Sequence, residues 1–315
     1  MTKLQPRFIE RLGARGRAIT DIAVTSDGET FAVCFDHEAT LAVASWAAGT
    51  QICQITAPST VEAIAFAPDG GRIAAACVDG RVYEFEIPGA NQVAQLEGGN
   101  GGYYDVAWSP DGSLIVAGHY EPIVSAFDAL GIRPATTLDA GIFSDEGRTA
   151  VAFSPDGATF ASTAGNTLLR WSVPQMKCRK LELKEYAFIV DAQFSRSGML
   201  VAGLAEIEGR CSLHVWHSAT GRKRGHIALP QFSQRMAWSA DDSFIAVIER
   251  DAPGVSLWDP ALLERSQASL EGVAMAMSAI AAHPERVAVI GGSEAGDLVI
   301  LERLNIAPNP KRKRS

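Results

Sequence analysis

The length, composition and charge of this chain already exclude several kinds of protein. Its 315 residues are 47% hydrophobic and 20% charged, which is the composition of a globular protein with a sizeable core and not of a long disordered chain. The formal net charge is −8, although four positive charges lie in the last five residues. Such an acidic body repels phosphate backbones and anionic lipids, which disfavours nucleic acid and membranes as main ligands.

The start of the chain and its cysteines indicate a soluble, cytoplasmic protein. The first residues, MTKLQPRFIERLG, contain no apolar segment of the secretory kind, and the longest apolar run, near Gly272 to Ala282, is too short to cross a bilayer. The cysteines are odd in number, form no Cys-x-x-Cys pair and lie in or beside apolar stretches. We expect reduced thiols, mostly buried, at Cys34, Cys53, Cys77, Cys178 and Cys211.

A phrase of two short apolar stretches joined by a Ser-Pro-Asp-Gly turn recurs along the chain. Proline presets φ for such a turn and glycine supplies the positive φ that ends it, so each copy predicts a β-hairpin. The turns repeat at intervals of 41 to 45 residues. The copies span Ile22–Phe35, Ile64–Cys77, Val106–Gly118, Val151–Thr163, Ala192–Leu204, Met236–Ile248 and Ile280–Gly292, with turns ending at Gly28, Gly70, Gly112, Gly157, Gly198, Asp242 and Glu285.

Each hairpin is followed by a polar loop and a third strand that carries an aromatic residue. A fourth strand can be placed before the next hairpin, as in RKRGHIAL. Four short strands in each repeat of about 40–45 residues are typical of a propeller blade. The aligned aromatics are Phe85, Phe127, Trp171, Trp216 and Trp258.

These repeats resemble those of the WD-repeat β-propeller family over nearly the whole chain. Leu257–Pro260, LWDP, holds the one literal Trp-Asp pair. Leu96–Asn100 stands where that family has Gly-His, and the Gly225-His226 pair falls inside an expected fourth strand. The resemblance implies a rigid platform for protein contacts. The departures from the family pattern imply that its His–Asp–Ser–Trp hydrogen-bond network is missing from most blades, which rely more on apolar packing.

The fold predicted from these patterns is all-β: a single seven-bladed propeller of four-stranded antiparallel blades. We expect the propeller to span residues 1–304 and residues 305–315 to form a flexible basic tail. The segment Pro6–Gly13 precedes the first blade and can supply the fourth strand of the seventh, which would remove an exposed sheet edge.

The sequence shows no pattern of an active site. The six histidines form no cluster with metal-ligand spacing, since His214 and His217 are three apart and would lie on opposite faces of a strand. There is no phosphate-binding GxxxxGK[ST] loop. We therefore predict no catalytic residue, no metal and no cofactor.

One set of polar residues is expected near the central channel. Counting back seven positions from each turn gives the start of the innermost strand, and four of those positions carry charge. These side chains could bind a cation or pair with one another, and an ion pair between neighbouring blades, Asp191 with Arg235, is the favoured interpretation. The charged positions are Asp21, Asp105, Asp191 and Arg235.

A partner-binding surface is predicted on the rim where loops lead into blades three and four. Exposed tyrosine and arginine clusters are typical of binding hot spots. The alternative is that Tyr104 and Phe143 merely cap the blades. The group comprises Tyr103, Tyr104, His119, Tyr120, Phe143 and Arg148, and a less aromatic competitor comprises Phe232, Gln234, Arg235, Arg250 and Asp251.

The function predicted is that of a non-enzymatic scaffold or adaptor, which binds one or more proteins as a subunit of an intracellular assembly. The main alternative is a ligand-binding or hydrolytic propeller with its site at the channel mouth. A third, a chromatin- or RNA-linked adaptor, depends only on the basic tail PKRKR, which could also be a nuclear import signal in a eukaryotic host or could contact an acidic partner.

Overall fold

A computed structural model describes most of the chain as strands and short turns. The described residues are 3–9, 12, 16–98, 101–129, 135–139, 148–183, 187–230, 233–248, 255–265, 269–270 and 277–303. Within them every regular element is a β-strand, and no helix is long and apolar enough to cross a membrane.

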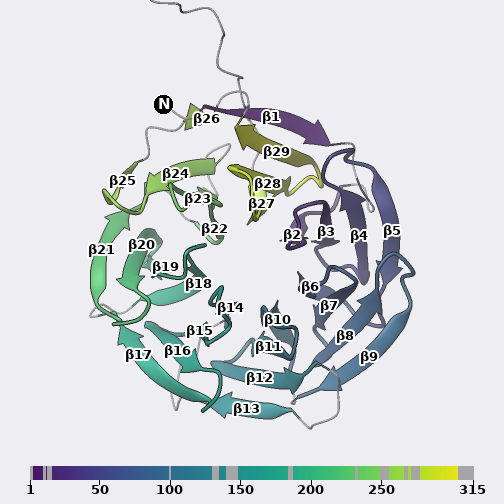
Figure 1. The fold of residues 1–315 in the computed structure, drawn as a ribbon, viewed down its shortest axis with the longest axis horizontal. Helices are drawn as coiled ribbons and strands as arrows, with labels where there is room; N and C mark the ends of the chain where they lie inside the picture. The colour runs from purple at the N-terminus through teal and green to yellow at the C-terminus, as the bar shows by residue number, and fades with distance from the viewer. Residues whose placement is uncertain are drawn as a thin grey trace, which may run out of the picture.

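Seven sheets stand around a central axis like blades (Figure 1). The first strand of each blade lies nearest the axis and the fourth forms the outer wall. Blades one to three consist of β2 (Ile19–Val24), β3 (Thr30–Phe35), β4 (Thr40–Ser45) and β5 (Gln51–Thr56); β6 (Val61–Phe66), β7 (Arg72–Cys77), β8 (Arg81–Glu86) and β9 (Gln92–Glu97); and β10 (Tyr103–Trp108), β11 (Leu114–His119), β12 (Ile123–Asp128) and β13 (Thr136–Asp139).

The remaining blades follow the same order, except that the seventh takes a strand from the start of the chain. Blades four to six consist of β14 (Val151–Phe153), β15 (Thr159–Ala164), β16 (Thr167–Ser172) and β17 (Lys177–Glu182); β18 (Phe188–Phe194), β19 (Leu200–Ile207), β20 (Arg210–His217) and β21 (Lys223–Ala228); and β22 (Met236–Trp238), β23 (Ile245–Ile248), β24 (Val255–Asp259) and β25 (Glu264–Arg265). Blade seven contains β27 (Met277–Ala282), β28 (Ala288–Ser293), β29 (Leu298–Arg303) and β1 (Lys3–Ile9), with β26 (Ser269–Leu270) beside β1.

The N-terminal strand closes the ring, as the sequence predicted, although it begins earlier than Pro6. β1 pairs antiparallel with β29, and β26 pairs parallel with its other edge, so this sheet has five strands. The guanidinium of Arg7 donates to the carbonyls of Trp46 (2.5 Å) and Ala47 (3.1 Å) in blade one. Ile9 joins the apolar cluster that contains Trp46. The strand therefore ties the last blade to the first.

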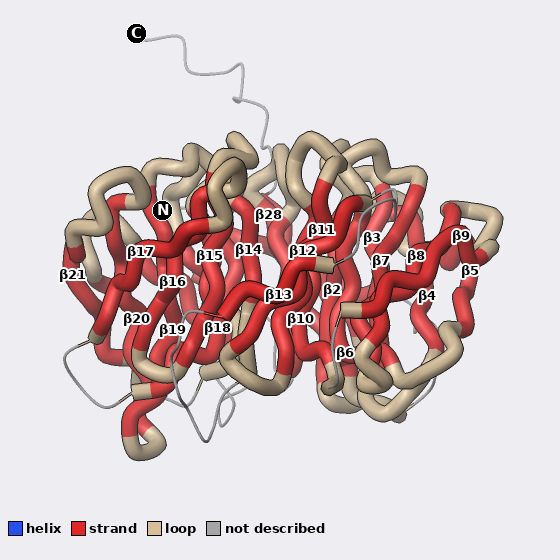
Figure 2. The backbone as a smooth tube through the Cα atoms, turned by 90° about the horizontal axis from the view of Figure 1, so that it is seen from below, coloured by secondary structure: helices blue, strands red, loops and turns tan. Residues whose placement is uncertain are grey.

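The repeated turns have the backbone that their sequence requires. Five turn glycines have φ between 68° and 72°, and Asp242 takes the same left-handed conformation with φ 57°. The third-strand aromatics are buried between blades, and the fourth strands are mostly exposed. Two faces result: a turn face, which carries these turns, and a loop face, which carries the loops leading into each first strand. In Figure 2 the β19–β20 hairpin projects on the loop face.

Parts of the family's polar network survive. The indole of Trp171 donates to the hydroxyl of Ser162 at 2.9 Å, and that of Trp258 donates to Ser256 at 2.7 Å. In blade three, His119 Nε2 and the Ser125 hydroxyl share a hydrogen bond of 2.8 Å. The five cysteines are free; Cys34, Cys77 and Cys211 are buried, and Cys53 and Cys178 are partly buried.

Asp242 replaces the turn glycine in blade six and also forms hydrogen bonds to the neighbouring blade. Its carboxylate accepts the backbone N–H groups of Arg196 (2.6 Å) and Ser197 (2.9 Å) in the turn of blade five. Four of the other turns have proline where blade five has Arg196, and proline has no N–H to donate. The two departures from the repeat thus compensate each other.

We expect Asp242→Gly to destabilise the protein by about 1 kcal/mol, because glycine keeps the positive φ but loses both hydrogen bonds. Asp242→Ala should cost more, about 2 kcal/mol, because alanine also strains the left-handed turn. Urea unfolding measures both. Equal stability of the glycine variant and the wild type would show that the link between the two turns contributes nothing.

Candidate functional site

The charged residues predicted near the axis do meet in the central channel. The inner strands of blades one, three and five each have a register shift just before the aspartate, at Asp21, Asp105 and Asp191. Such a bulge changes the direction in which a side chain points. All three carboxylates and Arg235 line one cavity along the axis.

Each aspartate also binds the next blade. Asp21 accepts the backbone N–H of Ile64 at 2.9 Å, Asp105 that of Val151 at 2.8 Å, and Asp191 that of Met236 at 2.9 Å. In blade seven, Ala279 takes the equivalent position, and the residue before it, Ser278, donates its hydroxyl to the carbonyl of Ile19 at 2.7 Å. These four contacts therefore join blade one to two, three to four, five to six and seven to one.

Arg235 supplies the positive charge that these carboxylates share. Burial lowers the pKa of Arg235, but Tyr104 and the three aspartates raise it more, so the guanidinium stays charged. Burial raises the pKa of Asp105 to about 7 and that of Asp191 to about 6 against the opposing effect of Arg235. The pKa of Asp21 is raised for the same reason. Arg235 thus interacts with all three carboxylates, whereas the sequence suggested a pair with Asp191 alone.

Tyr104 connects the channel to the loop face. Its ring lies between two guanidinium groups: the Cζ atom of Arg235 is 5.1 Å from the ring centroid and that of Arg148 is 5.2 Å from it. Tyr120 packs edge-on against Tyr104 with 5.7 Å between centroids. Burial and a hydrogen bond to the carboxylate of Glu62 raise the pKa of Tyr120. No pattern in the sequence pointed to Glu62 or to the contact of Arg235 with blade three.

The residues of the predicted rim lie together but differ in accessibility. Tyr103 is fully buried and His119 nearly so, with 4.4 Å between their ring centroids, and burial lowers the pKa of His119. The expectation that these two side chains are exposed was therefore wrong, because they pack inside blade three. It was also wrong for Tyr104, which is 8% exposed and covered by its neighbours. Tyr120 is 40% exposed and Arg148 is exposed.

Phe143 lies outside the described residues. Of the competing rim group, Gln234 is exposed and Arg235 faces the channel, whereas Phe232, Arg250 and Asp251 also lie outside the described residues. The accessible part of the predicted surface that the structure describes is thus Tyr120 and Arg148, with Tyr104 beneath them.

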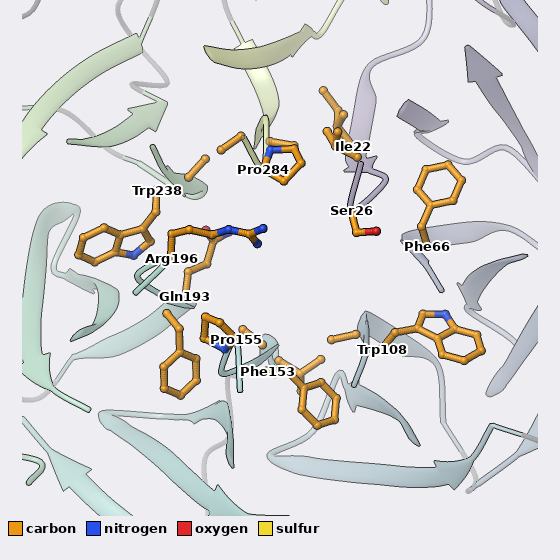
Figure 3. Close-up of a pocket in the computed structure, with 18 of the residues that line it drawn as sticks. Ile22, Ser26, Phe66, Trp108, Phe153, Pro155, Gln193, Arg196, Trp238 and Pro284 are labelled. Carbon is orange, nitrogen blue, oxygen red and sulfur yellow. The ribbon is translucent and has the colours of Figure 1, made fainter. Parts of the chain in front are cut away.

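The cavity that the charged residues line extends to the turn face. This cavity has a volume of about 800 Å³. Figure 3 looks into it and shows the Arg196 side chain reaching towards the middle, while Trp108, Phe66 and Trp238 point outwards. Proline and alanine side chains from the turns form much of its mouth. The turn-face end of the cavity is therefore lined by the Arg196 guanidinium and apolar side chains. Its other end is lined by the three carboxylates and Arg235.

The metal-site and histidine expectations can be compared with the structure. Among the described residues, no three His, Cys, Asp or Glu side chains are placed to hold a metal ion. His214 is buried, and burial followed by the charges of Lys223 and His226 lowers its pKa to about 3, whereas His217 on the same strand is exposed. The two histidines face apart, as their spacing predicted.

Comparison with known proteins points to one family. The model of the WD domain, G-beta repeat, matches residues 49–85 and 90–127. The chain is 27% identical over 259 residues to eukaryotic translation initiation factor 3 subunit I of Lodderomyces elongisporus, which covers 69% of this chain and 73% of that protein.

Two further relatives match a shorter part. WD repeat-containing protein 1 of Gallus gallus is 30% identical over 84 residues and that of Xenopus tropicalis 29% identical over 84 residues. Each match covers 26% of this chain, and this chain spans only 14% of each of those proteins. The family match falls on blades one to three, and the same four-stranded unit continues around the ring. This chain is thus a seven-bladed β-propeller that contains WD repeats at residues 49–85 and 90–127.

Proposed function

We propose that this protein is a non-enzymatic interaction subunit of a cytoplasmic multiprotein assembly. The observation that carries the proposal is the layered group on the loop face, in which exposed Tyr120 and Arg148 lie against Tyr104. Tyrosine and arginine contribute strongly to protein interfaces because they bury a large area. The aspartate links between blades hold this surface rigid, which lowers the entropic cost of binding.

The relatives support a role within a complex. The one that covers most of this chain is, by its name, a subunit of a translation initiation factor. The finer parts of the proposal are that the partner contacts the loop face at Tyr104, Tyr120 and Arg148, and that Phe143 adds to this contact. The basic tail, residues 305–315, would separately contact an acidic partner.

The test uses a double substitution, Tyr120→Ala with Arg148→Ala, in the full-length protein. We expect circular dichroism and melting to change little, because both side chains are exposed. Capture of partners from the native host, quantified by mass spectrometry, should weaken at least about tenfold, or about 1.4 kcal/mol.

The matched control lies on the turn face: Arg196→Ala with Met199→Ala, both exposed. It should leave capture unchanged. Loss of capture in the control but not in the loop-face variant would move the interface to the channel mouth and favour the alternative of a ligand-binding propeller. Hydrolytic turnover that disappears in Asp105→Ala would replace the scaffold by an enzyme.

A further inference from the structure

The outer wall of blades four and five is strongly basic in an otherwise acidic protein. The chain has a net charge of −8, yet two neighbouring outer strands and the turn before the second carry six exposed cations. Neither the channel nor the loop-face group includes any of them. The six are Lys177, Arg179 and Lys180 on β17, Arg222 in the turn before β21, and Lys223 and Arg224 at the start of β21.

The two groups form one surface, which we call the basic wall. β17 and β21 are neighbouring outer strands in both views of the molecule (Figures 1 and 2). The guanidinium of Arg179 lies against Gly221, since a Cβ on that glycine would be 3.1 Å from Arg179 Cζ. Arg224 donates to the carbonyl of Ala261 at 3.0 Å in blade six. The basic wall therefore runs continuously from β17 across the turn into β21.

Protection of sheet edges does not explain this clustering. Lysine on an outer strand does discourage edge-to-edge aggregation. However, the outer strands of blades one, two and three, QICQIT, QVAQLE and TTLD, contain no lysine or arginine. Two of them expose Ile52 (45%) and Val93 (46%) instead. The positive charge is thus concentrated where two particular blades meet.

The shape and charge of the basic wall define the partner. β17 is the last strand of its sheet, so its outer edge can pair with another strand. Six residues of strand extend about 20 Å, which suits an extended segment of about six to eight residues. Glu182 ends the strand, so a long polyphosphate that followed β17 would meet a carboxylate, and repulsion between exposed charges acts over about 8–10 Å.

We propose that an acidic, extended segment of a partner protein docks along the free edge of β17, with its carboxylates beside the cations of β17 and β21. This rests on the proposed function, because it gives the scaffold a second contact with its assembly, on the outer wall and away from the loop face. Main-chain hydrogen bonds to β17 would hold the segment, and charge would select it.

The probe for binding is a fluorescent eight-residue peptide of alternating glutamate and threonine, followed by anisotropy. The test variant is Lys177→Gln, Lys180→Gln and Arg222→Gln. The matched control removes three exposed arginines elsewhere: Arg17→Gln, Arg196→Gln and Arg210→Gln. Both variants change the net charge equally, so a general electrostatic effect would weaken them equally.

We expect the basic-wall variant to bind the peptide at least tenfold more weakly and the control variant less than twofold more weakly. Methylation of alternate backbone amides of the peptide should weaken binding to the wild type, because it blocks strand pairing. Hydrogen exchange should show protection of β17 amides by the unmethylated peptide. Equal loss in both variants, or tighter binding of an eight-residue oligouridylate than of the peptide, would overturn the proposal.

The same variants separate this inference from the proposed function. Suppose that the peptide does not bind but the Tyr120→Ala, Arg148→Ala variant loses partner capture. This result would reject the docking of an acidic segment on β17 and leave the proposed loop-face interface standing. Peptide binding that depends on the basic wall, with partner capture unaffected by the loop-face variant, would instead support the segment and reject the loop face as the interface.

Discussion

Deleting residues 1–13 should lower the stability of the protein by at least about 3 kcal/mol and cause aggregation. The deletion removes β1, whose six residue pairs with β29 close the ring. It also removes the hydrogen bonds of Arg7 to blade one and the packing of Ile9 against the Trp46 cluster. The edge of β29 would then be free to pair with other chains. Thermal unfolding and size-exclusion chromatography measure both effects.

The control is deletion of residues 305–315, which we expect to leave melting unchanged because the sequence predicts a flexible tail there. Adding a synthetic peptide of residues 1–13 to the shortened protein should restore part of the lost stability. A protein without residues 1–13 that remains monomeric and melts at the wild-type temperature would show that the ring does not need this strand.

Replacing Arg235 by glutamine should destabilise the protein by at least about 2 kcal/mol at pH 8, and by less at pH 5. The substitution leaves three buried carboxylates without their shared cation, which is costly when they are ionised. Arg196→Gln, a substitution of an exposed arginine, should have little effect at either pH.

The direction of this pH dependence follows from the aspartates. The pKa values of Asp105, about 7, and Asp191, about 6, are raised above the usual value of about 3.9 in an unfolded chain. Between the unfolded pKa of about 3.9 and the native values of about 6 and about 7, the native protein therefore binds more protons than the unfolded chain. Their contribution to stability is fully present below about pH 4 and is lost as the pH rises through 6 and 7.

Asp105→Asn removes the carboxyl group with the higher pKa of these two, so the melting temperature of this variant should vary less with pH between 5 and 8 than that of the wild type. In the Arg235→Gln background the same substitution should recover stability at pH 8, because it removes one of the unpaired charges. Melting curves of the four proteins across pH measure these differences. An Arg235→Gln variant equally destabilised at pH 5 and pH 8 would mean that the arginine acts through packing and not through charge.

Much of the fold could be predicted because its information is local and repeated. A Pro-Asp-Gly turn such as that ending at Gly112 sets its own backbone, and apolar residues on either side form a hairpin. Equivalent positions in successive repeats occupy equivalent places in the ring. This is why counting back from the turns located Asp21, Asp105 and Asp191 at the channel. The neighbouring positions of KCRK and RKRG on the outer wall follow from the same periodicity.

The contacts between distant blades could not be predicted in this way. Tyr103 and Tyr104 are adjacent and alike in sequence, but a register shift between Tyr103 and Asp105 decides that the first is buried inside blade three and the second lies between two arginines. Arg235 of blade six reaches the aromatic ring of Tyr104 in blade three only when the seven blades are closed into a circle. No local pattern specifies which side chains meet across its axis.

The sequence by itself determined the number of blades, the order of strands, the closing strand and the positions nearest the axis, because turn chemistry and strand period act within each repeat. Only the tertiary structure decided which of those residues share charge, which aromatic side chains remain accessible, and that Asp242 links its turn to that of blade five. These depend on side chains that come from separate repeats, and their distances are fixed only when all seven blades are packed around one axis.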